Sequence, residues 1–352
     1  MRVLIIGGTR RTGPFLVKQL IEHGHSVVVF HRGQHNLRLV EGAQEILGDR
    51  RDVSRFKSAM ASLKVDVVVD TMATDDEDVR AVVAAFRGRI RRYVCISSYD
   101  VYAAYTDAWT RTPSLQPVPI PEDAPKTVQS DLYGREQRYD KMRVEQEVAA
   151  AQASHAFEAT ILRWPALYGP RDTTPREWYY VKQATDKRPR IPVIDGGRSL
   201  FSRGYFENMA HSILLAVESD IASGQTYNAA DTHAITPWQI ATMIGDILGH
   251  TWEVISVPRV LMPACVQSQA RPYSCDPYDI EPHLLLDVTK IRTELGYTDL
   301  VPCRTAMERT VEWLVSNPPT QEPPFDYRAL DHVLDKYHAC ISSVVGGLEA
   351  GT

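Results

Sequence analysis

The stretch that decides the fold stands at the start of the chain and reads Val3-Leu4-Ile5-Ile6-Gly7-Gly8-Thr9-Arg10-Arg11-Thr12-Gly13-Pro14. Its first four residues are apolar without polar alternation, which predicts a strand buried on both faces of a parallel sheet. The glycines that follow permit a tight turn and let a pyrophosphate approach backbone N–H groups. A helix is predicted to begin near Pro14, and its N-terminus would add positive charge for an anion.

This strand–turn–helix context predicts a dinucleotide-binding turn, whereas the alternative is a strand-to-helix connection that binds no ligand. Position 10, where a middle glycine is usual, holds an arginine. The residues expected to contact the cofactor at the turn are Gly7, Thr9, Arg10, Arg11, Thr12 and Gly13.

The end of the second predicted strand bears on the choice of nucleotide. Ser26–Phe30 is followed by His31-Arg32-Gly33, without the carboxylate that would accept the ribose hydroxyls of NAD. Arg32 and Arg10 instead offer two guanidinium groups where a 2′-phosphate would lie, and a guanidinium suits bidentate contact with phosphate. NADP(H) is therefore the predicted cofactor. The alternative is NAD, with both arginines simply solvated.

Further cofactor contacts are predicted after the third and fourth strands. Asp49 follows the third strand, where its carboxylate could accept a hydrogen bond from the adenine amino group, and Arg50 stands beside it. Met72 and Ala73 follow the fourth strand, where they could line the ribose. All of these positions lie at the carboxyl ends of predicted parallel strands, which is the edge where open α/β sheets bind ligands.

Short apolar runs alternate with helical patterns from residue 1 to about residue 170. Segments of helical period, such as Phe15–His23 and Val79–Phe86, lie between the runs. This alternation predicts βαβ units and an α/β fold, a Rossmann-type doubly wound parallel sheet. The predicted strands are Val3–Ile6, Ser26–Phe30, Glu45–Leu47, Val65–Asp70, Tyr93–Ser97 and Thr160–Arg163.

The chain is predicted to have three parts. Residues 1–170 form the dinucleotide-binding domain, and later segments return to it. Residues 171–316 form mainly a smaller α/β substrate domain at the carboxyl edge of the sheet. Residues 317–352 form a linker and a C-terminal helix, which is predicted at Tyr327–Tyr337. Within the first part, the Pro- and Thr-rich stretch Tyr105–Lys126 is predicted to be a loop.

Composition limits the class of protein. Apolar residues make up 44% and charged residues 24%, which is ordinary for a globular chain. The net charge is −5 and basic residues are dispersed, so no nucleic-acid partner is expected. The five cysteines are widely spaced, which indicates neither a disulfide framework nor a metal site. Without a leader or a spanning apolar run, a cytoplasmic protein that contacts no membrane is expected.

Taken together, these residues resemble the extended short-chain dehydrogenase/reductase superfamily and its NAD-dependent epimerase/dehydratase family. The turn is similar to that of a branch that includes the chloroplast stem-loop-binding proteins. Ile96-Ser97-Ser98-Tyr99-Asp100-Val101-Tyr102 resembles the family's serine strand. The segment from Leu162 to Pro170 resembles the one that runs under the nicotinamide, which implies that Pro165 contacts the cofactor. The resemblance covers roughly residues 1–316, through Tyr227-Asn228 and Asp287–Gly296, and implies a homodimer.

The resemblance also implies a reaction centre. In this family a serine holds the substrate oxygen, a tyrosine acts as general acid/base, and a lysine four residues later assists the tyrosine. A phenol titrates at about 10, so it needs an adjacent cation to act as a base near neutrality. A spacing of four residues on a helix places the two side chains on one face. Ser98 occupies the serine position.

The tyrosine and the lysine can be placed in two registers. Aligning Lys141 with the family lysine leaves Gln137 in the tyrosine position. Aligning Tyr139 with the family tyrosine substitutes Arg143 for the lysine. Tyr139 and Lys141 are two residues apart, about 200° around a regular helix, so they pair only if the helix is irregular there. Both registers stay open, and the candidate catalytic residues are Ser98, Tyr139, Lys141 and Arg143.

The predicted function is that of an NAD(P)-dependent oxidoreductase or epimerase/dehydratase acting at a carbinol or carbonyl of a small sugar-like or natural-product substrate. These reactions share one site because each begins with hydride removal or delivery at one carbon. The alternative is a nucleotide-binding protein with altered chemistry, either a redox sensor or an RNA-binding relative. The acidic net charge disfavours RNA binding, while the broken Tyr-x-x-x-Lys pattern favours the sensor.

Overall fold

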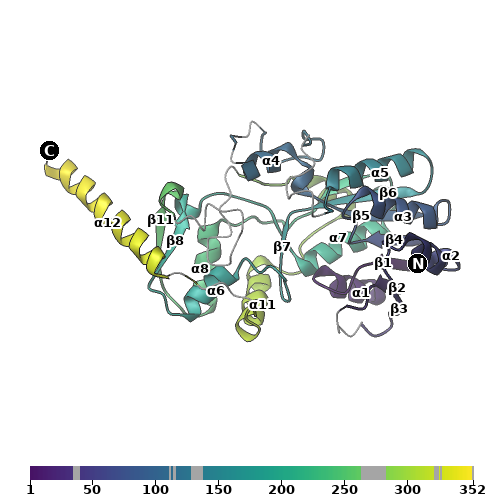
Figure 1. Ribbon diagram of the computed structural model, residues 1–352, viewed down its shortest axis with the longest axis horizontal. Coiled ribbons are helices and arrows are strands. Elements are labelled where there is room, and N and C mark those ends of the chain that lie inside the picture. Colours follow the sequence, from purple (N-terminus) through teal and green to yellow (C-terminus); the bar gives the residue numbers. More distant parts are fainter. Residues whose placement is uncertain are drawn as a thin grey trace. The chain divides into compact units, whose positions relative to one another are not determined.

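The computed structural model describes residues 1–34, 40–110, 112–113, 116–127, 138–262, 283–320, 325 and 327–350. The chain divides into two compact units, each assembled from separate stretches of sequence. The first unit comprises Met1–Leu167, Ser202–Ala234 and Pro282–Cys303, and the second comprises Tyr168–Phe201, Ile235–Glu281 and Arg304–Thr352. Figure 1 labels the helices and strands of both units.

The first unit is built on a seven-stranded parallel sheet (Figure 1). Its strands are β1 (Arg2–Ile6), β2 (Ser26–His31), β3 (Gln44–Leu47), β4 (Val67–Asp70), β5 (Arg92–Ser98), β6 (Glu158–Trp164) and β10 (Thr226–Asn228). Their order in the sheet is β10-β6-β5-β4-β1-β2-β3. The order reverses between β1 and β4, which confirms the predicted Rossmann-type doubly wound sheet and points to a ligand site at the carboxyl ends of these strands.

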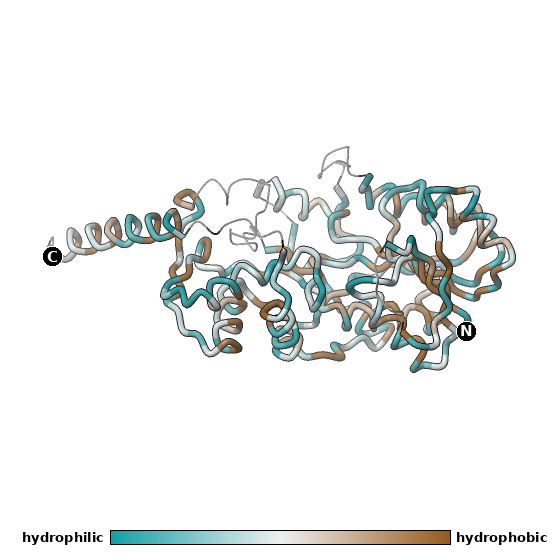
Figure 2. Tube along the Cα trace, turned by 60° about the horizontal axis from the view of Figure 1, so that its bottom comes forward, coloured by the Kyte–Doolittle hydropathy of each residue, from teal (hydrophilic) through white to brown (hydrophobic). Residues whose placement is uncertain are grey.

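Successive residues of the strands pack against helices on opposite faces of this sheet. Val3 and Ile5 lie in one core with α1 (Thr12–Glu22), α7 (Phe206–Glu218) and α10 (Thr289–Leu295). Leu4 and Ile6 lie in a second core with α2 (Val53–Ala61), α3 (Asp76–Phe86) and α5 (Lys141–Ala153). Figure 2 accordingly shows long apolar stretches in the strands near the N-terminus. Burial on both faces explains why these strands are continuous apolar runs in the sequence.

The loop predicted over Tyr105–Lys126 is wrong in its first residues, because α4 (Ala103–Thr110) continues through them. Ala104 and Tyr105 are buried on this helix, and the ring of Tyr105 lies 4.7 Å from the ring of Tyr99. Tertiary packing therefore supports a helix that the local sequence pattern does not reveal. The shorter elements of this part of the chain are η1 (Tyr99–Val101), β7 (Ala166–Tyr168), β9 (Arg203–Tyr205) and η3 (Asp220–Ala222).

The second unit contains a two-stranded parallel sheet of β8 (Arg190–Ile194) and β11 (Glu253–Val257). Its other elements are α6 (Trp178–Thr185), η2 (Asp195–Gly197), α8 (Pro237–Ile247), η4 (Arg259–Leu261), α11 (Cys303–Ser316) and α12 (Tyr327–Ala350). The C-terminal helix is thus longer than the predicted Tyr327–Tyr337. Leu330 and Leu334 anchor it by packing with Ile194 and Val257. In the part of the chain that the structure describes, no helix combines the length and the apolar character needed to cross a membrane.

Candidate active site

The turn between β1 and α1 is shaped by its glycines. Gly7 and Gly8 have φ values of 97° and 81°, in the region that favours glycine. A Cβ on Gly7 would lie 2.4 Å from Thr71 Oγ1 and 2.7 Å from Met72 Cγ, and a Cβ on Gly13 would lie 2.2 Å from the carbonyl carbon of Gly8. Gly7 is therefore closed in by the side chains of Thr71 and Met72, and Gly13 by the backbone of Gly8, so neither position leaves room for a larger residue.

The first turn of α1 is suited to an anion. Thr12 is 4% exposed, and its hydroxyl oxygen has no hydrogen-bond partner among the described residues. Arg11 precedes the helix and makes no side-chain cap. N–H groups left uncapped at a helix N-terminus attract phosphate. The glycine turn, the buried hydroxyl and the helix end without a side-chain cap together fit the pyrophosphate of a dinucleotide, and Thr9, Arg10 and Arg11 lie in the same turn.

The predicted nucleotide-selecting residues lie at the same edge of the sheet. Arg32 is exposed directly after β2, whose residue Phe30 pairs with Ile6 at the end of β1. Asp49 is exposed after β3, and its carboxylate accepts the backbone N–H of Arg51 at 2.9 Å. The structure thus brings Arg32 and Asp49 to the carboxyl ends of neighbouring strands, as the sequence predicted.

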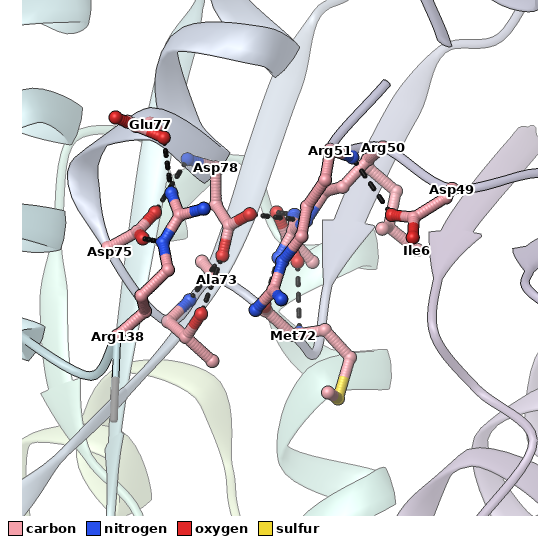
Figure 3. Close-up of polar contacts among 12 residues, drawn as sticks. Ile6, Asp49, Arg50, Arg51, Met72, Ala73, Asp75, Glu77, Asp78 and Arg138 are labelled. Carbon is pink, nitrogen blue, oxygen red and sulfur yellow. Dashed lines mark hydrogen bonds and ion pairs between the residues drawn. The ribbon is translucent and has the colours of Figure 1, made fainter. Parts of the chain in front are cut away.

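Arg50, in contrast, belongs to an internal ion cluster. Its Nη1 lies 2.5 Å from Asp70 Oδ2, its Nε lies 2.9 Å from Asp78 Oδ1, and its Nη2 donates to the carbonyl of Met72. Figure 3 shows the guanidinium directed at Asp78 and Met72. Burial alone would lower the pKa of Arg50, but the two carboxylates outweigh it and raise that pKa. In place of the predicted cofactor contact, Arg50 holds the segment after β4.

That segment carries the two residues predicted to line the ribose. The N–H of Met72 donates to Asp70 Oδ1 at 2.9 Å, and the Met72 side chain is half exposed beside Gly7. Ala73 is fully buried and contributes its carbonyl oxygen instead of its side chain. Pro165, which follows β6, is also buried. Of Met72, Ala73 and Pro165, Met72 is the residue whose side chain is exposed and could contact a ligand beside the glycine turn.

The residues of the predicted reaction centre lie near the end of β5, the strand that carries Ser98. Ser98 is the last residue of that strand, and its hydroxyl oxygen accepts the backbone N–H of Asp100 at 3.2 Å. Tyr139 donates its phenol hydrogen to Asp100 Oδ2 at 2.8 Å, and the nearby Ser98 hydroxyl acts to lower the pKa of Tyr139. The structure therefore brings Ser98 and Tyr139 together from positions far apart in the sequence.

The helix α5 begins only at Lys141, so the chain is irregular at Asp140, which is the condition under which Tyr139 and Lys141 can adjoin. Asp140 is its N-cap and accepts the N–H of Arg143 at 3.0 Å, so Tyr139 precedes the helix. The Lys141 ammonium donates to the carbonyls of Ala73 and Ile96 at 2.7 and 2.8 Å, and lies 5.6 Å from the centre of the Tyr139 ring.

Arg143 is not brought to the tyrosine. Its side chain is 62% exposed, and its Nε lies 3.3 Å from Asp140 Oδ2. Of the two candidate cations, Lys141 is therefore the one that adjoins Tyr139. Gln137 lies outside the described residues. An Asp followed by a helical pattern is a capping signal, and it could have located the start of α5 from the sequence.

A buried network that sequence reasoning missed lies within the same unit. Glu145 accepts hydrogen bonds from Ser97 Oγ at 2.7 Å and from Arg163 Nε at 2.9 Å. Arg163 in turn donates to the hydroxyl of Tyr102 at 2.8 Å, and this hydroxyl donates to Asn228 at 2.7 Å. Burial raises the pKa of Tyr102 to about 12. Tyr102 is therefore a structural phenol and a poor candidate for proton exchange.

Known proteins are similar to this chain in sequence or in architecture. The 2′-dehydrokanamycin reductase of Streptomyces kanamyceticus is 25% identical over 263 residues, which cover 73% of this chain and 70% of the reductase. The chloroplast stem-loop binding protein of 41 kDa b of Arabidopsis thaliana is 25% identical over 248 residues, 67% of this chain and 60% of that protein. The UDP-glucuronic acid 4-epimerase from Bacillus cereus, solved in complex with NAD, superposes with a TM-score of 0.66 at 17% identity, covering 90% of this chain and 99% of the epimerase.

A family profile settles the relationship. The profile described as the NAD dependent epimerase/dehydratase family matches residues 3–230, from β1 through β10. The match therefore includes the glycine turn, the serine strand and every strand of the seven-stranded sheet. A match of this length shows that the chain belongs to the NAD-dependent epimerase/dehydratase family, whose members are enzymes of the short-chain dehydrogenase/reductase type.

Proposed function

We propose that the protein is an NADP(H)-dependent oxidoreductase or epimerase/dehydratase that acts at a carbinol or carbonyl of a small sugar-like or natural-product molecule. The observation that carries the proposal is the pair of Ser98 and Tyr139, which are both hydrogen-bonded to Asp100 at the end of β5, beside Lys141. Such a pair can hold a substrate oxygen and exchange its proton. The substrate class follows the names of the relatives, a 2′-dehydrokanamycin reductase and a UDP-sugar epimerase.

Each residue of the pair has its own task in this proposal. Ser98 donates a hydrogen bond to the substrate oxygen, where negative charge grows as a carbonyl is reduced. Tyr139 gives a proton to that oxygen or takes one from it. Lys141 adds a positive charge on the face of the Tyr139 ring. When bound at the glycine turn, the nicotinamide dinucleotide supplies or accepts the hydride.

The preference for NADP(H) rests on charge. Arg32 is exposed at the end of β2, and Arg10 is exposed in the turn, while no carboxylate ends β2. Two guanidinium groups at this edge favour a nucleotide with an additional phosphate. NAD is the alternative. The homodimer implied by the resemblance and the cytoplasmic location stay predictions.

A nucleotide-binding sensor without turnover is the second candidate function. One observation favours it: the oxygen of Tyr139 contacts the carboxylate of Asp100, where the family pattern calls for a cation. A carboxylate raises the pKa of a neighbouring phenol, so less of the phenol is ionised near neutral pH than when an ammonium adjoins it. Turnover by the protein therefore decides between the two functions.

Two measurements test the proposal. Calorimetric titration should show tighter binding of NADPH than of NADH; equal affinities, or a preference for NADH, would contradict the cofactor assignment alone. Turnover is then followed with UDP-glucose and an oxidised nucleotide, and with benzil and a reduced one. Ser98→Ala should lower kcat about 100- to 1000-fold, since one donor to the developing oxyanion is lost. Ser58→Ala, which changes an exposed serine on α2, is the matched control. Tight nucleotide binding without turnover of either probe would favour the sensor.

A further inference from the structure

The hydroxyl of Tyr139 faces a carboxylate that no part of the family pattern accounts for. Asp100 lies in η1 directly after β5 and is 9% exposed. It accepts the phenol hydrogen at 2.8 Å, while its own backbone N–H donates to Ser98 at 3.2 Å. Ser98, Asp100 and Tyr139 therefore form one hydrogen-bonded cluster, in which the phenol proton points at an oxygen of Asp100.

The position of Tyr139 is fixed by the residues on both sides of it. Arg138 pairs with Asp75 at 2.8 Å, as Figure 3 shows. The N–H of Asp140 donates to the carbonyl of Thr74 at 2.7 Å. Both partners directly precede α3, so residues 138–140 are tied to the N-terminus of this helix. The contact between Tyr139 and Asp100 is therefore held by the fold on either side of the tyrosine.

Neither Lys141 nor Arg143 is hydrogen-bonded to the Tyr139 hydroxyl in the way that Asp100 is. The Lys141 ammonium is used by two backbone carbonyls and lies against the face of the Tyr139 ring, while Arg143 is directed to solvent. Burial first, and then the carboxylate of Asp100, raise the pKa of Tyr139 well above the ordinary value of a phenol. A lasting phenolate would have to form beside a negative charge, which is unfavourable in a partly buried site.

A phenol avoids that charge if it gives up its own proton as it receives another. The acceptor must then be hydrogen-bonded to the phenol before the reaction, and a carboxylate at 2.8 Å meets this condition. We propose that Asp100 is the proton acceptor of this site: as Tyr139 takes the proton of a substrate hydroxyl, it passes its own proton to Asp100. The inference rests on the proposed function and deepens it.

In the oxidative direction the carbinol loses a hydride and a proton. The carbinol C–H bond breaks, and its electron pair leaves with the hydrogen as hydride to the oxidised nicotinamide dinucleotide. The carbinol O–H bond breaks and its proton goes to Tyr139, whose O–H bond breaks in turn and gives its proton to Asp100. The products are a carbonyl, the reduced dinucleotide and a protonated Asp100, which releases the proton to solvent. In the reductive direction the same protons move back to the substrate oxygen.

Titration of the tyrosine signals tests the coupling without cofactor or substrate. The full chain is labelled with ¹³C at Cζ of tyrosine, and the Tyr139 signal is the one lost in Tyr139→Phe. It should shift at acidic pH as Asp100 gains its proton, and this shift should vanish in Asp100→Asn. In Asp100→Asn the phenol should also ionise at lower pH, because the carboxylate that raised its pKa is gone. Asp123→Asn, which changes an exposed carboxylate, should leave both titrations unchanged. A Tyr139 signal that is the same with and without Asp100 overturns the inference.

Turnover of UDP-glucose and benzil tests the role. Asp100→Asn should lower kcat about 100- to 10,000-fold with unchanged affinity for the nucleotide, because the proton loses its acceptor. Added formate should restore part of the rate by acting as the acceptor, and Asp100→Glu should retain more activity than Asp100→Asn. A purely structural role would show neither rescue. Unchanged turnover in Asp100→Asn defeats the inference alone, whereas no turnover by the unmodified protein defeats the proposed function and the inference with it.

Discussion

Gly13 shows how tightly a single position of the phosphate turn is constrained. A Cβ there would lie 2.2 Å from the carbonyl carbon of Gly8, and backbone cannot move aside as a flexible side chain can. Gly13→Ala should therefore open the turn, lower stability by about 1–3 kcal/mol and weaken nucleotide binding. Urea unfolding and calorimetric titration measure the two effects. Gly346→Ala is the control, since a Cβ there meets nothing within 4 Å. Full nucleotide affinity in Gly13→Ala would contradict the placement of the dinucleotide at this turn.

At the residue scale, local sequence patterns were sufficient to predict the glycine turn between the first strand and the first helix. Gly7, Thr12 and Gly13 could be placed at the junction of the first strand and helix because strand, turn and helix follow one another directly. Arg50 could not be assigned correctly, because its partner Asp70 lies 20 residues further along the chain. From sequence, a buried arginine and an arginine that binds phosphate look alike. Their difference lies in which carboxylates the fold brings beside them.

Arg50 also joins three secondary structure elements. It follows β3, pairs with Asp70 at the end of β4, and pairs with Asp78 in α3. Arg50→Gln would leave buried carboxylates without their counter-charge, which costs about 3–5 kcal/mol when a buried pair is broken. The free energy of unfolding in urea should fall by that amount. Arg51→Gln changes the exposed neighbour and should alter stability little. Equal losses in the two variants would show that the cluster adds nothing to stability.

The elements differ in how far the sequence could predict them. All six predicted strands are present within two residues at each end. The strands β1, β2 and β4 are buried on both faces and appear as continuous apolar runs, whereas β3 is mostly exposed. The start of α5 was harder, because helical periodicity does not show where a helix begins. The cap at Asp140 sets that point and places Tyr139 outside the helix. The hydroxyl of Tyr139 donates to Asp100, which lies in η1. A spacing rule for residues on one face of a helix therefore could not identify this partner.

The whole molecule contains a C-terminal helix whose two ends are in different environments. Leu334 is 1% exposed and packs within the second unit, whereas Leu348 on the same helix is 69% exposed. Leu334→Ala should lower the stability of the second unit by about 2–5 kcal/mol, because a buried leucine leaves a cavity. Leu348→Ala should change it little. Thermal unfolding followed by circular dichroism compares them, and similar shifts in Tm for both would show that the helix is not anchored at Leu334.

The division into units marks the limit of what the sequence could predict for the molecule as a whole. Apolar periodicity gives elements, and the order of elements gives the sheet, but the segments Ser202–Ala234 and Pro282–Cys303 belong to the first unit through packing at long range. The α7 helix illustrates this, since Ile213 and Leu214 join the core formed by β1 and α1. Contacts between such distant segments leave no local pattern in the sequence.

The same interleaving governs the order in which the fold can be completed on the ribosome. Strands β1 to β6 are synthesised before Tyr168–Phe201, a stretch of the other unit, and only then does β10 emerge to pair with β6. At about 5–20 residues per second, the outer edge of β6 stays without its neighbour for several seconds. An unpaired strand edge is a template for other chains. The nascent protein is therefore open to mispairing during this interval, and a pause in translation between β6 and β10 would prolong it.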